Sequence, residues 1–174
     1  RIKIAKARRA RAVNRAHAHR AEHSRQHIQM MHFRDRDIPQ YVRDGVADIA
    51  IIGDNTEKEK KTGIRHVLDL GFSRCRLSIA VPKNVDFQDI SYLQGKKIAT
   101  SYPNSLKDFL TENDIEAEIH EISGSVEIAP NIGLADAICD LVSSGSTLFK
   151  NGLKEVYKIF ESQAILVANS GLCG

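Results

Sequence analysis

Short apolar runs alternate with helix-forming segments from residue 37 to residue 168, and this alternation restricts the architectures that the chain can adopt. Strands are expected at 48–52, 75–81, 97–100, 117–122, 137–142, 156–160 and 164–168. Helices are expected after Asp37, at 90–93 and from Pro103 to about Asn113, whereas the lysine-rich stretch 55–63 is interpreted as a solvated loop. Strands that alternate with helices are typical of an α/β fold with largely parallel sheets.

The segment from Glu127 to Leu148 carries the clearest chemical signal. Its apolar run 137–142 contains one carboxylate, Asp140, and an acid inside a buried strand usually has a specific role. The loop Ser143–Thr147 follows, with four hydroxyls in five residues, and a helix can begin after it. Backbone N–H groups in such a loop can hold a phosphate. The alternatives are a connecting loop without a ligand and an Asp140 that only caps the turn.

Charge is distributed unevenly along the chain. Residues 1–36 contain 11 Lys and Arg against 2 acids, and the remainder contains 14 against 20, so a basic head precedes an acidic body. Ile2–Ala5 can form a first strand, and residues 11–33 can form a basic amphipathic helix or a solvated arm. Clustered arginines also allow a nucleic-acid-binding arm, which the acidic body disfavours.

Cysteine, histidine and hydropathy patterns exclude several protein classes. The three cysteines show no metal-ligand spacing and indicate a reducing, cytoplasmic location. Five of the seven histidines lie in the first 32 residues without a recognisable ligand frame, so no metal site formed by the protein is predicted. No apolar run approaches membrane-spanning length, and we expect no membrane association.

Several motifs occur together in one order along the chain. They are DIPQYVRDGVADIAIIG (37–53), LGFSRCRLSIAVP (70–82), GKKIATSYP (95–103), SGSVEIAP (123–130) and the segment 127–148. Together they resemble the ATP phosphoribosyltransferases of histidine biosynthesis, over about residues 33–169. The motifs RDxDIP and CRLS are more similar to the long form of that family.

The resemblance implies a two-lobed, periplasmic-binding-protein-like (type II) fold with largely parallel mixed sheets. Two hinge-crossing strands are expected near 78–83 and 164–170. One lobe would comprise 1–80 with 166–174 and bind ATP, and the other would comprise 81–165 and bind phosphoribosyl pyrophosphate (PRPP). The C-terminal histidine-sensing domain of the long form is not expected in this chain.

The implied reaction joins N1 of the adenine of ATP to C1 of PRPP and releases pyrophosphate. By motif position, Glu127 and Asp140 would accept hydrogen bonds from the ribose 2- and 3-hydroxyls and favour an oxocarbenium-like centre. Asp140, Leu141 and Val142 with the loop Ser143, Ser144, Gly145, Ser146 and Thr147 would form the PRPP site. The alternatives are a helix-start acid for Glu127 and a turn cap for Asp140.

The resemblance also indicates residues for ATP. They are Arg11, Arg34, Asp35, Asp37, Thr100, Ser101 and Tyr102. Tyr102 can stack on adenine, contact phosphate, or only pack at a hinge. Ala10 stands where the family shows glycine, and Arg36 interrupts the family's acidic triplet.

The remaining expectations concern partners. Mg²⁺ would be carried by the substrate pyrophosphate, and the chain would form a homo-oligomer. The alternative functions are a non-catalytic two-lobed module that binds a phosphorylated small molecule, and nucleic-acid binding through the basic head.

Overall fold

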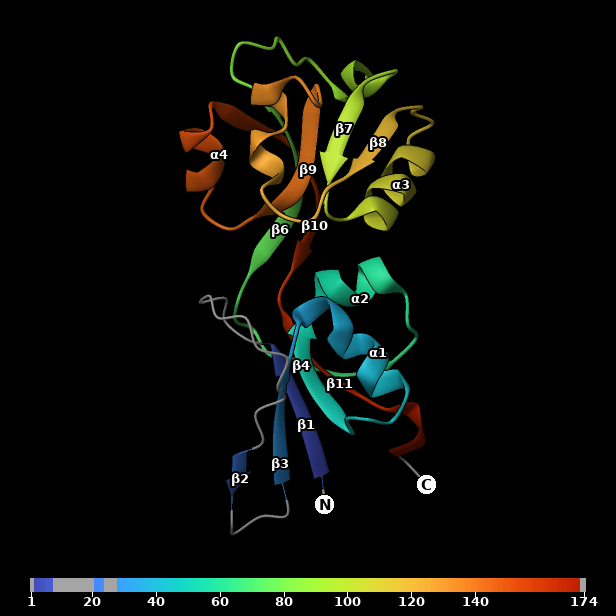
Figure 1. The fold of residues 1–174 in the computed structure, drawn as a ribbon. Coiled ribbons are helices and arrows are strands. Elements are labelled where there is room, and N and C mark those ends of the chain that lie inside the picture. Colours follow the sequence, from blue (N-terminus) through green and yellow to red (C-terminus); the bar gives the residue numbers. More distant parts are fainter. Residues whose placement is uncertain (1, 8–20, 24–27, 173–174) are drawn as a thin grey trace. The chain divides into compact units, whose positions relative to one another are not determined.

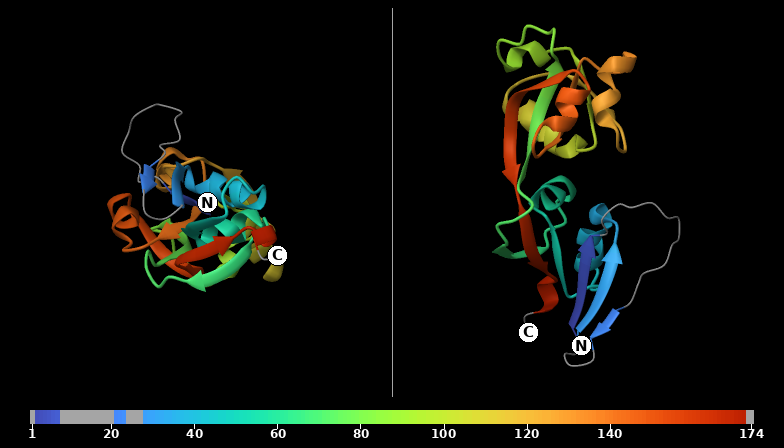
Figure 2. Two further views of the ribbon diagram at one scale, coloured as in Figure 1. Left: turned by 90° about the horizontal axis from the view of Figure 1, so that it is seen from below. Right: turned by 90° about the vertical axis from the view of Figure 1, so that its left-hand side faces the viewer.

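The computed structural model describes residues 2–7, 21–23 and 28–172. The chain forms two compact units, which we treat separately (Figures 1 and 2). Unit 1 comprises Arg1–Ser73 and Gln163–Gly174, and unit 2 comprises Arg74–Ser162. In the described part of the chain, no helix is both long enough and apolar enough to cross a membrane.

Unit 1 contains a six-stranded mixed sheet in the order β2-β3-β1-β4-β11-β5. Its strands are β1 (Ile2–Ala7), β2 (Ala21–His23), β3 (Ile28–Phe33), β4 (Ile49–Gly53), β5 (Arg65–Asp69) and β11 (Ala164–Ala168). The central strands β3, β1 and β4 run parallel, and β2, β11 and β5 pair antiparallel with their neighbours. Consequently, the carboxyl ends of β3 and β4 lie at the same edge of this sheet.

The helical elements η1 (Asp35–Asp37) and α2 (Asp54–Lys60) of unit 1 begin at that edge, whereas η5 (Ser170–Leu172) follows the antiparallel strand β11. The 3-10 helix η1 leads into α1 (Ile38–Arg43), and α2 follows β4. Ile38 and Val42 of α1 pack on the strand residues Ala50, Ile52 and Val167, and together they form the core of the unit. Figure 1 shows α1 and α2 beside β4.

Helix α2 contradicts the prediction of a solvated loop at 55–63. Three polar residues of this segment, Asn55, Thr56 and Glu59, are buried. An ion pair between Lys58 and Asp54, one turn apart at 2.5 Å, supports the helix. The charged composition of this segment is compatible with a helix as well as with a solvated loop, because Glu and Lys are good helix formers.

The basic head also differs from the prediction over its described residues. Residues 21–23 and 28–33 form strands rather than a basic helix or a solvated arm. Strand β3 pairs with β1 along its whole length, from Ile2 opposite Ile28 to Ala7 opposite Phe33. Parallel pairing between distant segments stabilises a strand whose own sequence, IQMMHF, does not alternate clearly between apolar and polar residues.

Unit 2 contains a five-stranded mixed sheet in the order β10-β6-β9-β7-β8. Its strands are β6 (Cys75–Pro82), β7 (Lys97–Thr100), β8 (Glu118–Glu121), β9 (Ala137–Val142) and β10 (Leu153–Ser162). Its helical elements are η2 (Ile90–Leu93), α3 (Pro103–Glu112), η3 (Val126–Ile128), η4 (Pro130–Ile132) and α4 (Ser146–Lys150). Strand β9 runs parallel to β7 and antiparallel to β6.

The two faces of the unit 2 sheet bury separate cores. Cys139 belongs to the core that contains Leu106 and Phe109 of α3. Ile138 and Val142 belong to the other core, which contains Val126 of η3 and Leu148 of α4. Because successive side chains of a strand point to opposite faces, Asp140 lies on the face covered by η3 and α4.

Most predicted elements of unit 2 are confirmed, and its strands at 97–100 and 137–142 have the predicted bounds, as does the strand at 164–168 in unit 1. The α/β class is confirmed as well, although antiparallel pairs, which join β6, β10 and β11 to their neighbours, are as prominent as parallel ones. Strand β5 was not predicted. All five of its residues are exposed at the edge of the sheet, so it lacks the burial pattern that marks a strand.

Candidate functional site

The carboxyl edge of the unit 2 sheet brings together two of the predicted groups of residues. Strands β7 and β9 run parallel with Thr100 opposite Cys139, so the segments that follow both strands lie at one edge. Ser101 and Tyr102 follow β7, and the loop Ser143–Thr147 follows β9, in whose second half Asp140 lies. Ligands of α/β proteins commonly bind at the carboxyl ends of parallel strands.

Asp140 is an acid in an unfavourable place. Its carboxylate is largely buried, and this burial raises its pKa above the ordinary value, to which the negative charge of Glu127 adds. A hydrogen bond from the Leu141 N–H to Oδ1, at 2.8 Å, acts in the opposite direction. A buried carboxylate beside a second acid destabilises a fold, so the arrangement favours a functional role over a simple turn cap.

Glu127 lies in η3, which packs against β9. Its neighbour Val126 is buried in the core with Ile138, and this contact fixes the position of η3 over the strand. Glu127 itself is half-buried, and its charge acts on Asp140. The structure therefore brings the two predicted carboxylates close enough to interact, although they are 13 positions apart in the sequence.

The loop after β9 is exposed at its tip and anchored at both ends. Its four hydroxyl residues, Ser143, Ser144, Ser146 and Thr147, are all exposed. Val142 and Leu148 on either side are buried, and Gly145 adopts a left-handed conformation (φ +75°) immediately before α4. The hydroxyls of Ser144 and Ser146 lie 3.0 Å apart. Leu141 and Val142 pack into the two cores, so only their backbone is available to a ligand.

Thr100, Ser101 and Tyr102 have structural contacts. Thr100 is fully buried and donates to the Cys139 carbonyl at 2.7 Å, while its hydroxyl accepts from the Tyr102 N–H at 2.9 Å. Ser101 donates to the Ile122 carbonyl at 2.5 Å. Tyr102 packs partly against the core that contains α3. These contacts fix the turn between β7 and α3, and they leave only the partly exposed Ser101 and Tyr102 accessible.

Arg34, Asp35 and Asp37 lie in unit 1, immediately after β3. The Asp35 carboxylate accepts from Thr56 Oγ1 of α2 at 3.1 Å. Although much of Asp35 is exposed, the burial of its carboxylate beside α2 raises its pKa above the ordinary value, and the Thr56 bond partly offsets this. Asp37 occupies the N-cap position of α1, as predicted, but its side chain makes no capping hydrogen bond.

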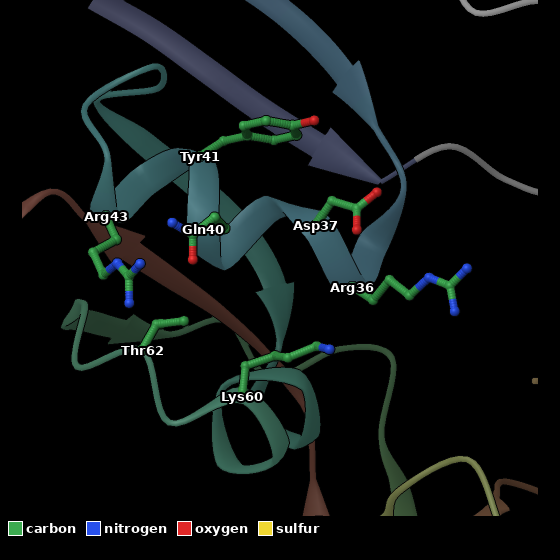
Figure 3. A pocket seen from close by; sticks show the side chains of 7 residues that line it. All are labelled: Arg36, Asp37, Gln40, Tyr41, Arg43, Lys60 and Thr62. Carbon is green, nitrogen blue, oxygen red and sulfur yellow. The ribbon is translucent and has the colours of Figure 1, made fainter. Parts of the chain in front are cut away.

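A pocket of about 330 Å³ lies between α1 and α2 (Figure 3). It is lined by Arg36, Asp37, Gln40, Tyr41, Arg43, Lys60 and Thr62. Figure 3 shows Lys60 and Thr62 on the opposite side of the pocket from Asp37 and Tyr41. Three cations against one carboxylate give the pocket a positive charge, which suits an anionic group.

Two further predictions concern the head and metal binding. Arg11 lies outside the described residues. Within the described ranges, no group of three or more His, Cys, Asp or Glu side chains has the arrangement needed to hold a metal ion.

Sequence reasoning missed several polar residues near these sites. In unit 2, Arg76 donates to the backbone of the loop, and Glu155 accepts from both Arg76 and Ser78. In unit 1, Arg43, Lys60 and Thr62 line the pocket. Arg76 could have been found from the sequence, because it is a charged residue inside the apolar strand CRLSIAVP. Its partner, 79 positions away, is visible only in the structure.

Comparison with known proteins identifies a single family. The sequence model of the family described as HisG: ATP phosphoribosyltransferase matches residues 34–173. The ATP phosphoribosyltransferase of Cytophaga hutchinsonii is 61% identical over 141 residues, which cover 81% of this chain and 49% of that protein. That of Phocaeicola vulgatus is 54% identical over 145 residues, covering 83% and 51%. The chain spans about half the length of these curated relatives.

Solved structures agree with the sequence relatives. A chain from the ATP phosphoribosyl transferase (HisG:HisZ) complex of Thermotoga maritima superposes with a TM-score of 0.82 at 27% identity, covering 97% of this chain and 88% of that chain. Tv2483 bound to L-arginine has a TM-score of 0.63 at 16% identity, over 82% and 61% of the two chains. A periplasmic sulphonate-binding protein from Escherichia coli has a TM-score of 0.59 at 14% identity, over 83% and 55%. The last two support the two-lobed binding-protein fold alone.

Proposed function

The chain belongs to the ATP phosphoribosyltransferase family, and on that premise we propose that it transfers the 5-phosphoribosyl group of PRPP to N1 of ATP. The products are N1-(5-phosphoribosyl)-ATP and pyrophosphate, in the first step of histidine biosynthesis. The observation that carries the proposal is the arrangement of Asp140, Glu127 and the hydroxyl-rich loop on one face of the unit 2 sheet.

In this proposal unit 2 binds PRPP. Glu127 and Asp140 accept hydrogen bonds from the ribose hydroxyls, and their negative charge stabilises the cationic character that develops at C1 as pyrophosphate leaves. The backbone N–H groups and the hydroxyls of the exposed loop Ser143–Thr147 hold the 5-phosphate. The raised pKa of Asp140 supports this role, because a buried acid that the fold does not need is typical of functional sites.

Unit 1 binds ATP in this proposal. Asp35 and Asp37 lie at the carboxyl edge of the parallel strands, with Arg34 exposed beside them. The adjoining pocket contributes Arg36 and Lys60, neither of which has an ion-pair partner among the described residues. Unpaired cations suit a triphosphate, and Tyr41 offers an aromatic side chain nearby. Ser101 and Tyr102 of unit 2 remain candidates for nucleotide contact. Thr100 is fully buried and its hydroxyl bonds within the turn, so it would position Ser101 and Tyr102 and not contact the nucleotide itself.

We propose that Mg²⁺ binds with the pyrophosphate of PRPP. Asp140 and Glu127 fit a cation nearby, because burial and, after it, the negative charge of Glu127 raise the pKa of Asp140. A positive charge on the substrate would reduce the cost of keeping Asp140 ionised. When bound, Mg²⁺ neutralises charge on the leaving pyrophosphate.

Pyrophosphate release tests the proposal. The chain is incubated with ATP, PRPP and Mg²⁺, and each substrate is omitted in turn. Release that requires both substrates supports the transferase. Release that does not depend on ATP, or no release at all, contradicts it. Retained PRPP binding without release would instead indicate a binding module.

Assembly and location complete the proposal. We expect the chain to form a homo-oligomer and to work in the cytoplasm, as suits a biosynthetic enzyme. Sedimentation velocity at several protein concentrations measures the assembly, and a single monomeric species at all of them contradicts it.

A further inference from the structure

Arg76 links two strands and the loop of unit 2. Its Nε and Nη2 donate to the two carboxylate oxygens of Glu155 on β10, each at 2.5 Å. Its Nη1 donates to the backbone carbonyl of Ser143, the first residue of the loop, at 3.2 Å. The guanidinium is therefore fixed by a bidentate ion pair on one side and holds the loop backbone on the other.

The cluster lies on the same face of the sheet as Asp140. Ser78 pairs directly with Asp140 across β6 and β9, and its hydroxyl donates to Glu155 Oε1 at 2.8 Å. Arg76 is two residues from Ser78 along β6, so both side chains leave the same face. Glu155 is thus connected to Arg76 and to the residue opposite Asp140. The ion pair holds the pKa of Glu155 below its usual range, so Glu155 stays ionised at neutral pH.

A carbonyl contact of this kind orients an N–H group. The peptide unit is planar and trans, so the Ser143 carbonyl and the Ser144 N–H point in opposite directions. When Arg76 holds the carbonyl, the direction of the N–H is set. The guanidinium also keeps a partially negative oxygen away from the part of the loop that would face a phosphate, and polarises the same peptide.

We propose that Arg76 is a positioning residue, which holds the loop Ser143–Thr147 through the Ser143 carbonyl so that the loop is ready for the 5-phosphate of PRPP. Glu155 acts through Arg76 by fixing the guanidinium. The ligand in this inference rests on the proposed function, whereas the effect of Arg76 on the loop does not.

The test uses Arg76→Lys, which keeps the charge but cannot hold Glu155 and Ser143 at once. PRPP binding with Mg²⁺ is measured by calorimetry, and we expect the Kd to rise about tenfold, the effect of losing one charge-assisted hydrogen bond. Glu155→Gln should weaken binding less. Its effect should disappear in the Arg76→Lys background, because Glu155 acts through Arg76.

Two further measurements separate positioning from other roles. Lys97→Gln removes an exposed cation that pairs with Glu118 at 3.9 Å on β7 and β8, on the other side of β9 from β6, and should leave the Kd unchanged. In the ¹⁵N spectrum of the free chain, the amide signals of residues 143–147 should shift in Arg76→Lys. A residue that only touches the ligand would leave the free loop unchanged.

Each outcome is decisive. An unchanged Kd in Arg76→Lys overturns the inference, and so does weaker binding with unchanged loop signals, which would indicate direct contact with PRPP. If the wild-type chain does not bind PRPP, the proposed function fails. The loop signals then decide alone: shifted signals support the positioning role of Arg76, and unchanged signals overturn it.

Discussion

Each unit carries a pair of acids at the carboxyl edge of its sheet, and the two pairs are held differently. In unit 2, Asp140 lies inside β9 on the face covered by η3 and α4, close to a loop whose backbone bonds to Arg76. In unit 1, Asp35 and Asp37 lie in a 3-10 helix next to an open, positively charged pocket. In the proposed assignment, the PRPP site of unit 2 would therefore be formed before ligand binding, whereas the ATP site of unit 1 would depend on exposed side chains that can adjust.

The largest expected effect concerns Asp140. Asp140→Asn removes the charge but keeps an oxygen that can accept the Leu141 N–H. We expect PRPP affinity to fall by about 2 kcal/mol, or about 30-fold, because hydrogen bonds to charged groups are worth about 1.5–3 kcal/mol. Calorimetry measures both substrates, and the affinity for ATP should not change.

The control for this variant lies immediately before the same strand. Asp136 accepts from the Lys97 N–H at 2.9 Å and is exposed just before the amino end of β9. Asp136→Asn should leave PRPP affinity unchanged. Equal losses in both variants would mean that the effect is general to the strand and that the acid pair of unit 2 has no special role.

Gly145→Ala tests whether the loop is preformed. Its φ of +75° is left-handed, and an added Cβ would only touch Val142 at 3.9 Å, so the strain lies in the backbone. The cost should be about 1–2 kcal/mol, shared between stability and PRPP affinity. Gly152→Ala, after the other end of α4 at φ +71° with open space around it, is the matched control. It should lower the melting temperature comparably and leave PRPP binding intact; equal binding losses would contradict a preformed loop.

Asp140→Asn should also stabilise the folded chain at neutral pH, by on the order of 1 kcal/mol. The folded-state pKa of Asp140 is raised above its unfolded value, so ionisation of this group destabilises the fold above that pKa. The advantage of the variant should therefore shrink as pH falls through the raised pKa towards the ordinary value. Urea unfolding from pH 7 to pH 4 measures it. Asp86→Asn is the control, because Asp86 is an exposed acid, and it should change stability by less than about 0.5 kcal/mol. If Asp140→Asn were less stable than the wild-type chain at neutral pH, the account would be contradicted.

The smallest effect is expected in unit 1. Lys60→Ala should weaken ATP binding about two- to fivefold, because an exposed charge contributes about 0.5–1 kcal/mol at most. The loss should diminish at high salt. Lys58→Ala is the control, since Lys58 lies on the same helix, pairs with Asp54 and does not line the pocket. A change in PRPP affinity with unchanged ATP affinity would reverse the assignment of the two units.

Sequence reasoning succeeded where the burial of a segment is visible as an apolar run in its own sequence. The run AICDLV is apolar, ends at a hydroxyl-rich loop and forms β9 with the predicted bounds. The role of its single acid in a site stays a prediction. Sequence reasoning failed where contacts with distant segments determine the structure of a segment or the partner of a side chain. Strand β3 depends on pairing with β1, α2 buries Asn55 and Thr56 despite their polarity, and Arg76 meets Glu155 across 79 positions. The pocket in unit 1 likewise combines Arg36 and Lys60 from separate elements.

The most direct test is to titrate PRPP with Mg²⁺ into the ¹⁵N-labelled chain and to follow the backbone amides. The account predicts that the largest shifts fall on Glu127 and on residues 140–147 of unit 2, with small changes around Asp35, Asp37 and Lys60. Shifts concentrated in unit 1, or spread evenly over both units, would contradict the claim that the acids and loop of unit 2 form the PRPP site.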